Sequence, residues 1–273
     1  MTSVREVRQV AHAARRHPGL EVLTRVGFLG FGITHLLVAW IAVQLTFGRA
    51  PAEGDQIGAF QLLREGPLGT PLLTVVAIGL AAMAFWQVLE AGFGHLDVKD
   101  AERVGERIAS AGRAVAYAFF SYSAVKVLTA PNSTGSQDKQ EAAGTLLSKP
   151  GGPVLVGAIG VGIVALSIGL VWYGLSRRFE RHLRTGEMSR YTRRTMRTLG
   201  VVGYSAKSVA YGIVGVLVVT AAMQYDPSAS RGLDAALRML AHQPWGDWLL
   251  FVVAAGFAAY GVFVLAKSRY RKV

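Results

Sequence analysis

The 273-residue chain contains no cysteine, which excludes disulfide bonds and thiol chemistry. It is also poor in charge, because only 17% of its residues are Asp, Glu, Lys or Arg, against about 25% in soluble domains. Hydrophobic residues make up 52% of the chain and gather in long runs. A soluble protein would have to bury these runs as helices with almost no polar face. The composition therefore favours a membrane protein.

Six apolar stretches have about 20 residues each, enough for a helix to cross the hydrocarbon core of a bilayer. They cover residues 26–47, 70–91, 110–130, 152–175, 201–223 and 247–267. The sequence thus predicts an all-α polytopic membrane protein with six transmembrane helices.

Positive charge is unevenly distributed along this chain, whose formal net charge is +12. Twenty of the 29 Lys and Arg residues lie in residues 1–25, 92–109, 176–200 and 267–273. The positive-inside rule places such basic segments in the cytoplasm. We therefore expect a protein of the cytoplasmic (inner) membrane with both termini cytoplasmic and the three less basic connections facing outward.

One helical pattern occurs three times. In the first helix of each repeat, two positions four residues apart hold Phe31 and His35, Arg113 and Tyr117, and Lys207 and Tyr211. The second helix of each repeat begins with Pro-x-Gly and has another glycine ten residues later. Small residues let membrane helices approach closely, so we expect packing positions here. They are Pro67, Gly69, Gly79, Pro150, Gly152, Gly162, Pro244, Gly246 and Gly256.

All three repeats start on the same side of the membrane, which predicts parallel two-helix hairpins around an axis near the membrane normal. We expect pseudo-three-fold packing, with a short helix in each outer loop. The first helix of each hairpin should face the centre, because Lys or Arg facing lipid is costly. The predicted segments are residues 1–23 (basic amphipathic cytoplasmic segment), 24–97 (repeat 1), 98–180 (repeat 2), 181–200 (basic cytoplasmic linker) and 201–273 (repeat 3 and basic tail).

The repeats resemble an integral-membrane family known as domain of unknown function 1206 (DUF1206), over roughly residues 24–268. The third repeat carries the closest resemblance, through Gly203, Tyr204, Ala206, Lys207, Tyr211, Gly215, the run from Asp234 to Leu237, Pro244, Gly246 and Gly256. The first repeat departs most, with Phe31 and His35 at the basic and Tyr positions. The resemblance implies the repeated membrane fold, but it supplies no expectation of an activity, since the family is named for its unknown function.

Two cations and three polar rings are the candidate site residues. Arg113 and Lys207 could form a shared site for an anionic headgroup or solute; alternatively they snorkel to the membrane interface or pair with Glu90. His35, Tyr117 and Tyr211 could form a central polar layer; alternatively they are a packed aromatic layer with satisfied hydroxyls.

Reactive motifs are missing from the sequence. Ser205 and Lys207 are two residues apart and do not share a helix face, and there is no H-E-x-x-H or Walker loop. We expect no enzymatic activity, no cofactor and no metal. The arginine-rich linker 176–200 could bind anionic membrane lipids or a cytoplasmic protein partner. Nucleic acid is not expected, because inner loops are basic for topological reasons.

These observations predict a non-enzymatic scaffold or accessory subunit that binds lipid or partner proteins. The alternative is a small channel or carrier for an anionic or lipid-like solute. The sequence does not set the oligomeric state.

Overall fold

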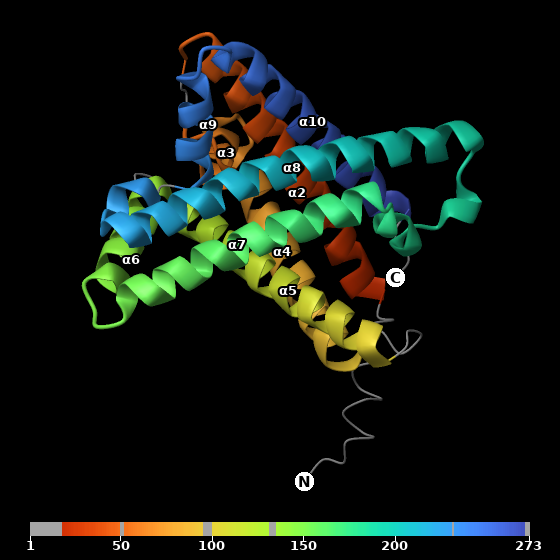
Figure 1. The fold of residues 1–273 in the computed structure, drawn as a ribbon. Helices are drawn as coiled ribbons and strands as arrows, with labels where there is room; N and C mark the ends of the chain where they lie inside the picture. Colours follow the sequence, from red (N-terminus) through yellow and green to blue (C-terminus); the bar gives the residue numbers. More distant parts are fainter. Residues whose placement is uncertain (1–17, 50–51, 95–99, 131–134, 231, 271–273) are drawn as a thin grey trace.

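A computed structural model describes residues 18–49, 52–94, 100–130, 135–230 and 232–270. The predicted amphipathic segment 1–23 is thus described only from residue 18, and the end of the basic tail lies outside these ranges. Regular structure in the described residues is helical throughout (Figure 1). The α-helices are α2 (Pro18–Thr46), α3 (Gln56–Glu65), α4 (Gly69–Phe93), α5 (Asp100–Thr129), α6 (Gly135–Leu147), α7 (Gly152–Leu175), α8 (Arg190–Gln224), α9 (Leu233–Ala241) and α10 (Gly246–Tyr270). Short 3-10 helices are η1 (Arg178–His182), η2 (Thr185–Glu187) and η3 (Pro227–Ser230).

Each repeat consists of a long, a short and a second long helix. The short helices α3, α6 and α9 confirm the prediction of a helix in each loop. They lie at one end of the bundle, here called the loop end (Figure 1). The other end, the linker end, carries the first turns of α2, α5 and α8 and the last turns of α4, α7 and α10.

Five helices are long and apolar enough to cross a membrane, as expected of a multi-pass membrane protein. They are α4, α7, α8, α10 and the part of α2 from Val22 to Thr46. The predicted count of six is not reproduced, because α5 is not among them. Its stretch 110–130 contains Arg113, Lys126 and several Ser and Tyr residues, which lower the mean hydropathy. α5 is nevertheless one unbroken helix that packs along α4.

The long helices pack around a shared core, but the ring that they form is interrupted. α2 packs on α4, α4 on α5, α7 on α8, α8 on α10, and α10 on α2. α5 and α7, the long helices of repeat 2, do not pack along each other. In the view of Figure 1, α7 and α8 run across α4 and α5. The expected pseudo-three-fold packing is therefore not seen in full: repeats 1 and 3 are closed hairpins, and repeat 2 is open.

The Pro-x-Gly pattern marks where the second long helix of each repeat begins. These helices start at Gly69, Gly152 and Gly246. The amide of each glycine donates to the carbonyl three residues earlier at 2.9 Å. A Cβ on any of the three would overlap a carbonyl oxygen near the end of the preceding short helix, that of Arg64, Leu146 or Ala241. Glycine is therefore required for this tight turn from the short helix into the long one.

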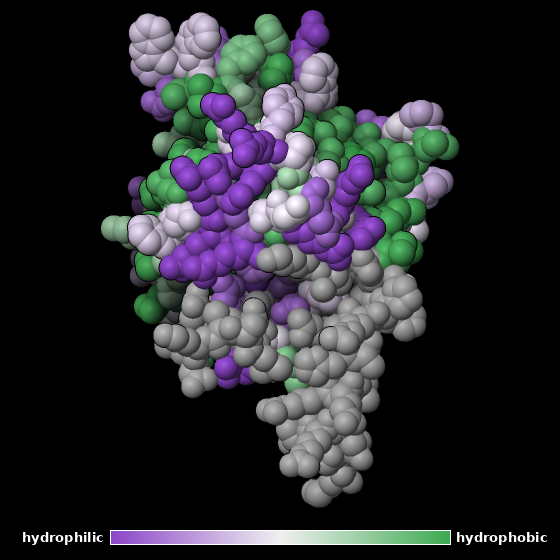
Figure 2. Space-filling view, turned by 90° about the vertical axis from the view of Figure 1, so that its right-hand side faces the viewer, coloured by the Kyte–Doolittle hydropathy of each residue, from purple (hydrophilic) through white to green (hydrophobic). Residues whose placement is uncertain are grey.

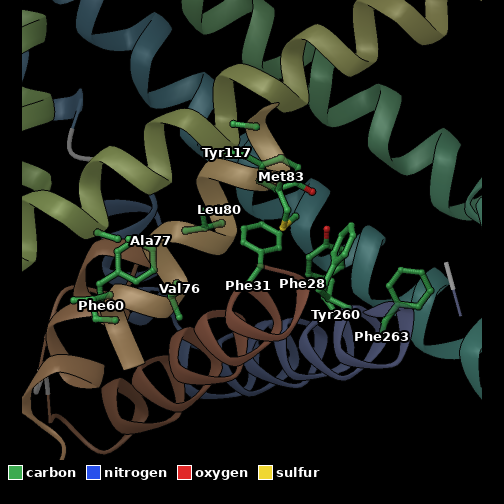
Figure 3. Packing of buried hydrophobic residues seen from close by; sticks show 14 of the residues in the cluster. Phe28, Phe31, Phe60, Val76, Ala77, Leu80, Met83, Tyr117, Tyr260 and Phe263 are labelled. Carbon is green, nitrogen blue, oxygen red and sulfur yellow. The ribbon is translucent and has the colours of Figure 1, made fainter. Parts of the chain in front are cut away.

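The core is aromatic and draws on all three first helices. Phe28 and Phe31 of α2, Tyr117 of α5 and Tyr260 of α10 belong to one buried cluster (Figure 3). Tyr204 of α8 belongs to the same cluster. The structure thus places residues of α2, α5 and α8 at the centre of the bundle, where the candidate site residues lie.

Candidate functional site

The centre of the bundle holds a buried lysine. Lys207 of α8 is 7% exposed. The ring centroids of Tyr260, Phe31 and Tyr211 lie 4.4, 5.2 and 5.3 Å from its Nζ. Aromatic faces attract a cation electrostatically, and more strongly when water is excluded. These rings come from α10, α2 and α8, so the site joins repeats 1 and 3.

His35 completes the surroundings of Lys207. The imidazole is fully buried, and its Nδ1 lies 2.8 Å from the carbonyl oxygen of Phe31. Because a carbonyl oxygen can only accept a hydrogen bond, Nδ1 carries the proton. Nε2, on the other side of the ring, therefore keeps a lone pair that can accept a hydrogen bond. The Nζ of Lys207 lies 3.4 Å from that Nε2 and donates to it. This geometry suits a neutral imidazole beside an ammonium group.

The three residues predicted to form a polar layer do lie near one another. His35 and Tyr211 both contact Lys207. Tyr117 packs edge-on against Phe31, with ring centroids 5.4 Å apart. The arrangement therefore has features of both interpretations: His35 hydrogen-bonds to the lysine, whereas Tyr117 takes part in aromatic packing.

Arg113 has partners of its own. Its Nε donates to Oε1 of Gln87 at 3.2 Å, and its Nη2 donates to Oγ of Ser110 at 2.9 Å. Gln87 lies on α4, one turn before Glu90, and Ser110 lies on α5 itself. Arg113 thus ties α5 to α4, whereas Lys207 lies among rings from α2, α8 and α10. The two cations use different sets of partners, which does not favour a single shared anion site.

The later glycines of the repeats differ in their surroundings. Gly79 packs directly against Gly27 of α2, and Gly256 packs against Ala206 of α8. Gly162 lies in open space, since no described atom outside the backbone of its own helix comes within 4 Å of where a Cβ would be. The predicted packing role is therefore seen at Gly79 and Gly256 and not at Gly162.

A cluster at the loop end, which the sequence did not indicate, ties the three repeats together. Asp55 is 1% exposed and caps α3, accepting from the amides of Ile57 and Gly58 at 2.9 and 3.0 Å. It also forms an ion pair with Lys139 of α6. Asp234 of α9 accepts from the amide of Gly54 at 2.8 Å. The residues of this cluster are up to 180 positions apart, so no local pattern could have identified it.

The arginine-rich segment, defined here as residues 176–197, comprises the connection between α7 and α8 and the first turns of α8, and a buried ring holds it in place. Phe179 of η1 is 1% exposed and stacks on Tyr204 with centroids 5.7 Å apart. It packs over Gly200, where a Cβ would meet the ring. The amide of Arg184 donates to the carbonyl of Tyr270 at 2.7 Å. The segment is thus fixed to both α8 and α10.

One carboxylate organises part of the positive charge in this segment. Glu180 accepts from Arg197 at 2.7 and 3.3 Å and lies 3.6 Å from the guanidinium of Arg193. The hydrogen bonds from Arg197 lower the pKa of Glu180 below its ordinary value, and the nearby charge of Arg193 adds to the effect.

Most of the arginines in the segment form an exposed basic surface. The exposed residues are Arg177, Arg178, Arg181, Arg190, Arg193 and Arg194. Figure 2 shows a broad hydrophilic area at this end of the molecule, bordered by hydrophobic surface. Trp172, which precedes the segment, and Tyr191, which lies within it, are 62% and 81% exposed. Aromatic residues of this kind are enriched at membrane–water interfaces.

Comparison with known proteins gives a family without a known activity. The family model described as Domain of Unknown Function (DUF1206) matches residues 26–94, 108–177 and 202–271. The chain is also similar to an uncharacterized protein, YxxB, of Bacillus subtilis (strain 168). The two are 28% identical over 261 residues, which cover 93% of this chain and 92% of that protein. No solved structure matches.

Proposed function

This chain belongs to the DUF1206 family, and we propose that it is a non-enzymatic scaffold or accessory subunit that binds anionic lipid headgroups through its arginine-rich segment. The proposal places the protein in the cytoplasmic membrane, with both termini and this segment on the cytoplasmic side. The observation that carries it is the exposed basic surface of the arginine-rich segment, which Phe179 and Glu180 hold in place.

Four features of the segment support lipid binding. It follows the apolar helix α7 and the exposed Trp172, a position in the chain that is typical of residues at headgroup level. Guanidinium groups match phosphate geometry and are weakly hydrated. Arg177 holds a left-handed backbone conformation with φ 56°. Glycine adopts this conformation with less strain, so an arginine at this position is consistent with a role for its side chain. The anchored backbone also reduces the side-chain and loop ordering that binding would otherwise require.

The test compares lipid binding by the native protein and by Arg177→Gln/Arg178→Gln/Arg194→Gln. Protein in mild detergent is titrated with phosphatidylglycerol or phosphatidylcholine, and bound lipids are counted by native mass spectrometry. Each basic side chain near an anionic surface contributes about 1 kcal/mol, so three substitutions should weaken phosphatidylglycerol binding on the order of 100-fold. Binding of phosphatidylcholine should not change.

The matched control removes the same charge from the loop end, as Arg49→Gln/Arg64→Gln/Lys149→Gln. It should leave phosphatidylglycerol binding near the native value. Equal losses in both variants would mean that net charge alone attracts the lipid, and the proposed site would be wrong. Native affinity in the arginine variant, with a co-purifying protein lost instead, would favour a protein partner at this segment.

A second candidate function, a carrier or channel for an anionic or lipid-like solute, is favoured by the buried cation Lys207 beside His35. It requires water to reach the centre. In this cysteine-free chain, Tyr117→Cys and Tyr211→Cys should then react with a membrane-impermeant thiol reagent. Protection of both cysteines would count against the carrier and leave the scaffold proposal standing.

A further inference from the structure

The two long helices of the first repeat pack through small residues. A Cβ at Gly79 would lie 2.6 Å from the Cα of Gly27, and a Cβ at Gly30 would lie 2.7 Å from a methyl group of Val76. Val76 and Met83, one turn to either side of Gly79, are 5% and 1% exposed. The face of α4 that carries these residues is thus covered by α2.

The third repeat closes in the same way at the equivalent positions. Gly256 of α10 packs against Ala206 of α8, and a Cβ at Gly203 would lie 2.6 Å from the Cα of Tyr260. Val253 and Tyr260, one turn to either side of Gly256, are each 7% exposed. The chain therefore contains two examples of the same contact between a first and a second helix.

In the second repeat the corresponding face of α7 is uncovered. Ile159 and Leu166, one turn to either side of Gly162, are 46% and 54% exposed. No described atom outside the backbone of α7 comes within 4 Å of a Cβ placed at Gly162 or Gly169. Gly169 occupies the position of Trp86, which is 2% exposed in repeat 1. α7 thus presents its half of the repeated contact to the outside.

The matching face of α5 is uncovered as well. Ala109, Gly112 and Ala116 are exposed, whereas Gly27 and Thr34, the counterparts in α2 of the first and last of them, are buried. Small residues typically occupy contacts between membrane helices and not surfaces that face lipid. α5 therefore presents the complementary half of the same contact, and both halves belong to one chain.

We propose that a second copy of this chain covers both faces, with α5 of one copy packed on α7 of its partner. A two-fold axis along the membrane normal preserves the direction in which each helix crosses. α5 therefore meets the partner's α7 antiparallel, as α2 meets α4. The same rotation brings α7 onto the partner's α5, so the interface closes on itself as a dimer. The proposal is independent of lipid binding at the arginine-rich segment.

Closure within one chain is the competing arrangement, and existing contacts oppose it. The hydroxyl of Ser121 in α5 donates to the carbonyl of Ala77 in α4 at 2.9 Å. Gly160 of α7 lies against Gly215 and Val219 of α8. Bringing α5 and α7 together would require α7 and α8 to move as a unit across α4 and α5. A second copy covers the same surfaces without this movement.

Disulfide cross-linking tests the proposal directly, because the native chain has no cysteine. Ala109 and Gly162 are the counterparts of Gly27 and Gly79, whose backbones touch in repeat 1. Two differently tagged chains, one carrying Ala109→Cys and the other Gly162→Cys, are expressed together and oxidised in the native membrane. We expect a disulfide-linked heterodimer, with about tenfold more product than from a control pair.

The control pairs Ala109→Cys with Ile168→Cys, which lies on another face of α7 and is 66% exposed. A chain that carries both Ala109→Cys and Gly162→Cys distinguishes the competing arrangement. An internal disulfide in that chain, with no dimer in the mixed expression, would show closure within the chain and overturn the proposal. Cross-linking no greater than in the control pair would mean that these faces contact lipid, which would also overturn it.

Discussion

Replacing Asp55 with alanine tests whether the loop-end cluster holds the three repeats together. The substitution removes the acceptor for the amides of Ile57 and Gly58, a helix cap whose loss costs about 1 kcal/mol. It also removes the ion-pair partner of Lys139. The side chain of Lys139 is 28% exposed and remains partly hydrated, so this loss adds about 1 kcal/mol and not the larger cost of a fully buried pair. We expect Asp55→Ala to lower the free energy of unfolding by about 2 kcal/mol.

Two further variants separate the contributions. Asp55→Asn keeps an oxygen that can cap α3 and loses only the charge, so about half of the effect should remain. Asp138→Ala breaks the ion pair with Lys126, where both side chains are about one-third exposed (31% and 40%) and the nitrogen–oxygen distance is 2.6 Å. An exposed pair of this kind contributes little to stability, because water screens the two charges.

The assay is equilibrium unfolding in mild detergent, followed by the fluorescence of the native tryptophans and by circular dichroism. The expected order of destabilisation is Asp55→Ala, then Asp55→Asn, then Asp138→Ala. If Asp138→Ala were as destabilising as Asp55→Ala, burial would not be the reason for the effect. The assignment of the cluster as a connection between repeats would then be refuted.

Two further predictions concern helix packing and acid stability. Gly79→Ala should lower stability by about 1–2 kcal/mol, because the added Cβ meets the backbone of Gly27, whereas Gly92→Ala on the same helix lies in open space and should be neutral or raise stability by up to about 1 kcal/mol. Equal effects in thermal unfolding would contradict the close approach of α2 and α4. Because Arg197 lowers the pKa of Glu180, the stabilisation by this pair is complete above the unfolded pKa of about 4.3 and is lost as the pH falls through the folded pKa. Glu180→Gln should therefore reduce stability at neutral pH and flatten its dependence on pH below about 5 in acid titrations; an unchanged acid profile would exclude this role.

Local features of the sequence predicted the helices well. The Pro-x-Gly pattern identified where α4, α7 and α10 begin, because the turn is built from the glycine and the residues just before it. Hydropathy located the apolar helices but overstated α5, which packs along α4 and is not among the helices apolar enough to span a membrane. Capping and turn chemistry act over a few residues, so a single sequence contains the whole signal.

Contacts between distant segments could not be predicted in this way. Lys207 was recognised as a candidate, but its contact with His35 depends on how α2 and α8 approach, and the two residues are 172 positions apart. Arg113 occupies the equivalent repeat position and has different partners, Gln87 and Ser110. Residues at equivalent positions of the repeats therefore lie on the same face of their helices but contact different residues.

The open hairpin of repeat 2 also depends on contacts between distant segments. One residue that bears on it can nevertheless be identified in the sequence. Phe263 of α10 is fully buried and packs edge-on against Tyr204 of α8, with centroids 5.8 Å apart. A buried aromatic ring covers about 150–250 Å², which corresponds to roughly 4–6 kcal/mol of apolar burial. Gly169 has no side chain at the equivalent position of α7, so closing repeat 2 within the chain would gain none of this energy. Ser110 of α5 and Gly169 of α7 stand where repeat 3 has Tyr204 and Phe263, so within the chain no ring contact competes with the packing of α5 on α4 and of α7 on α8.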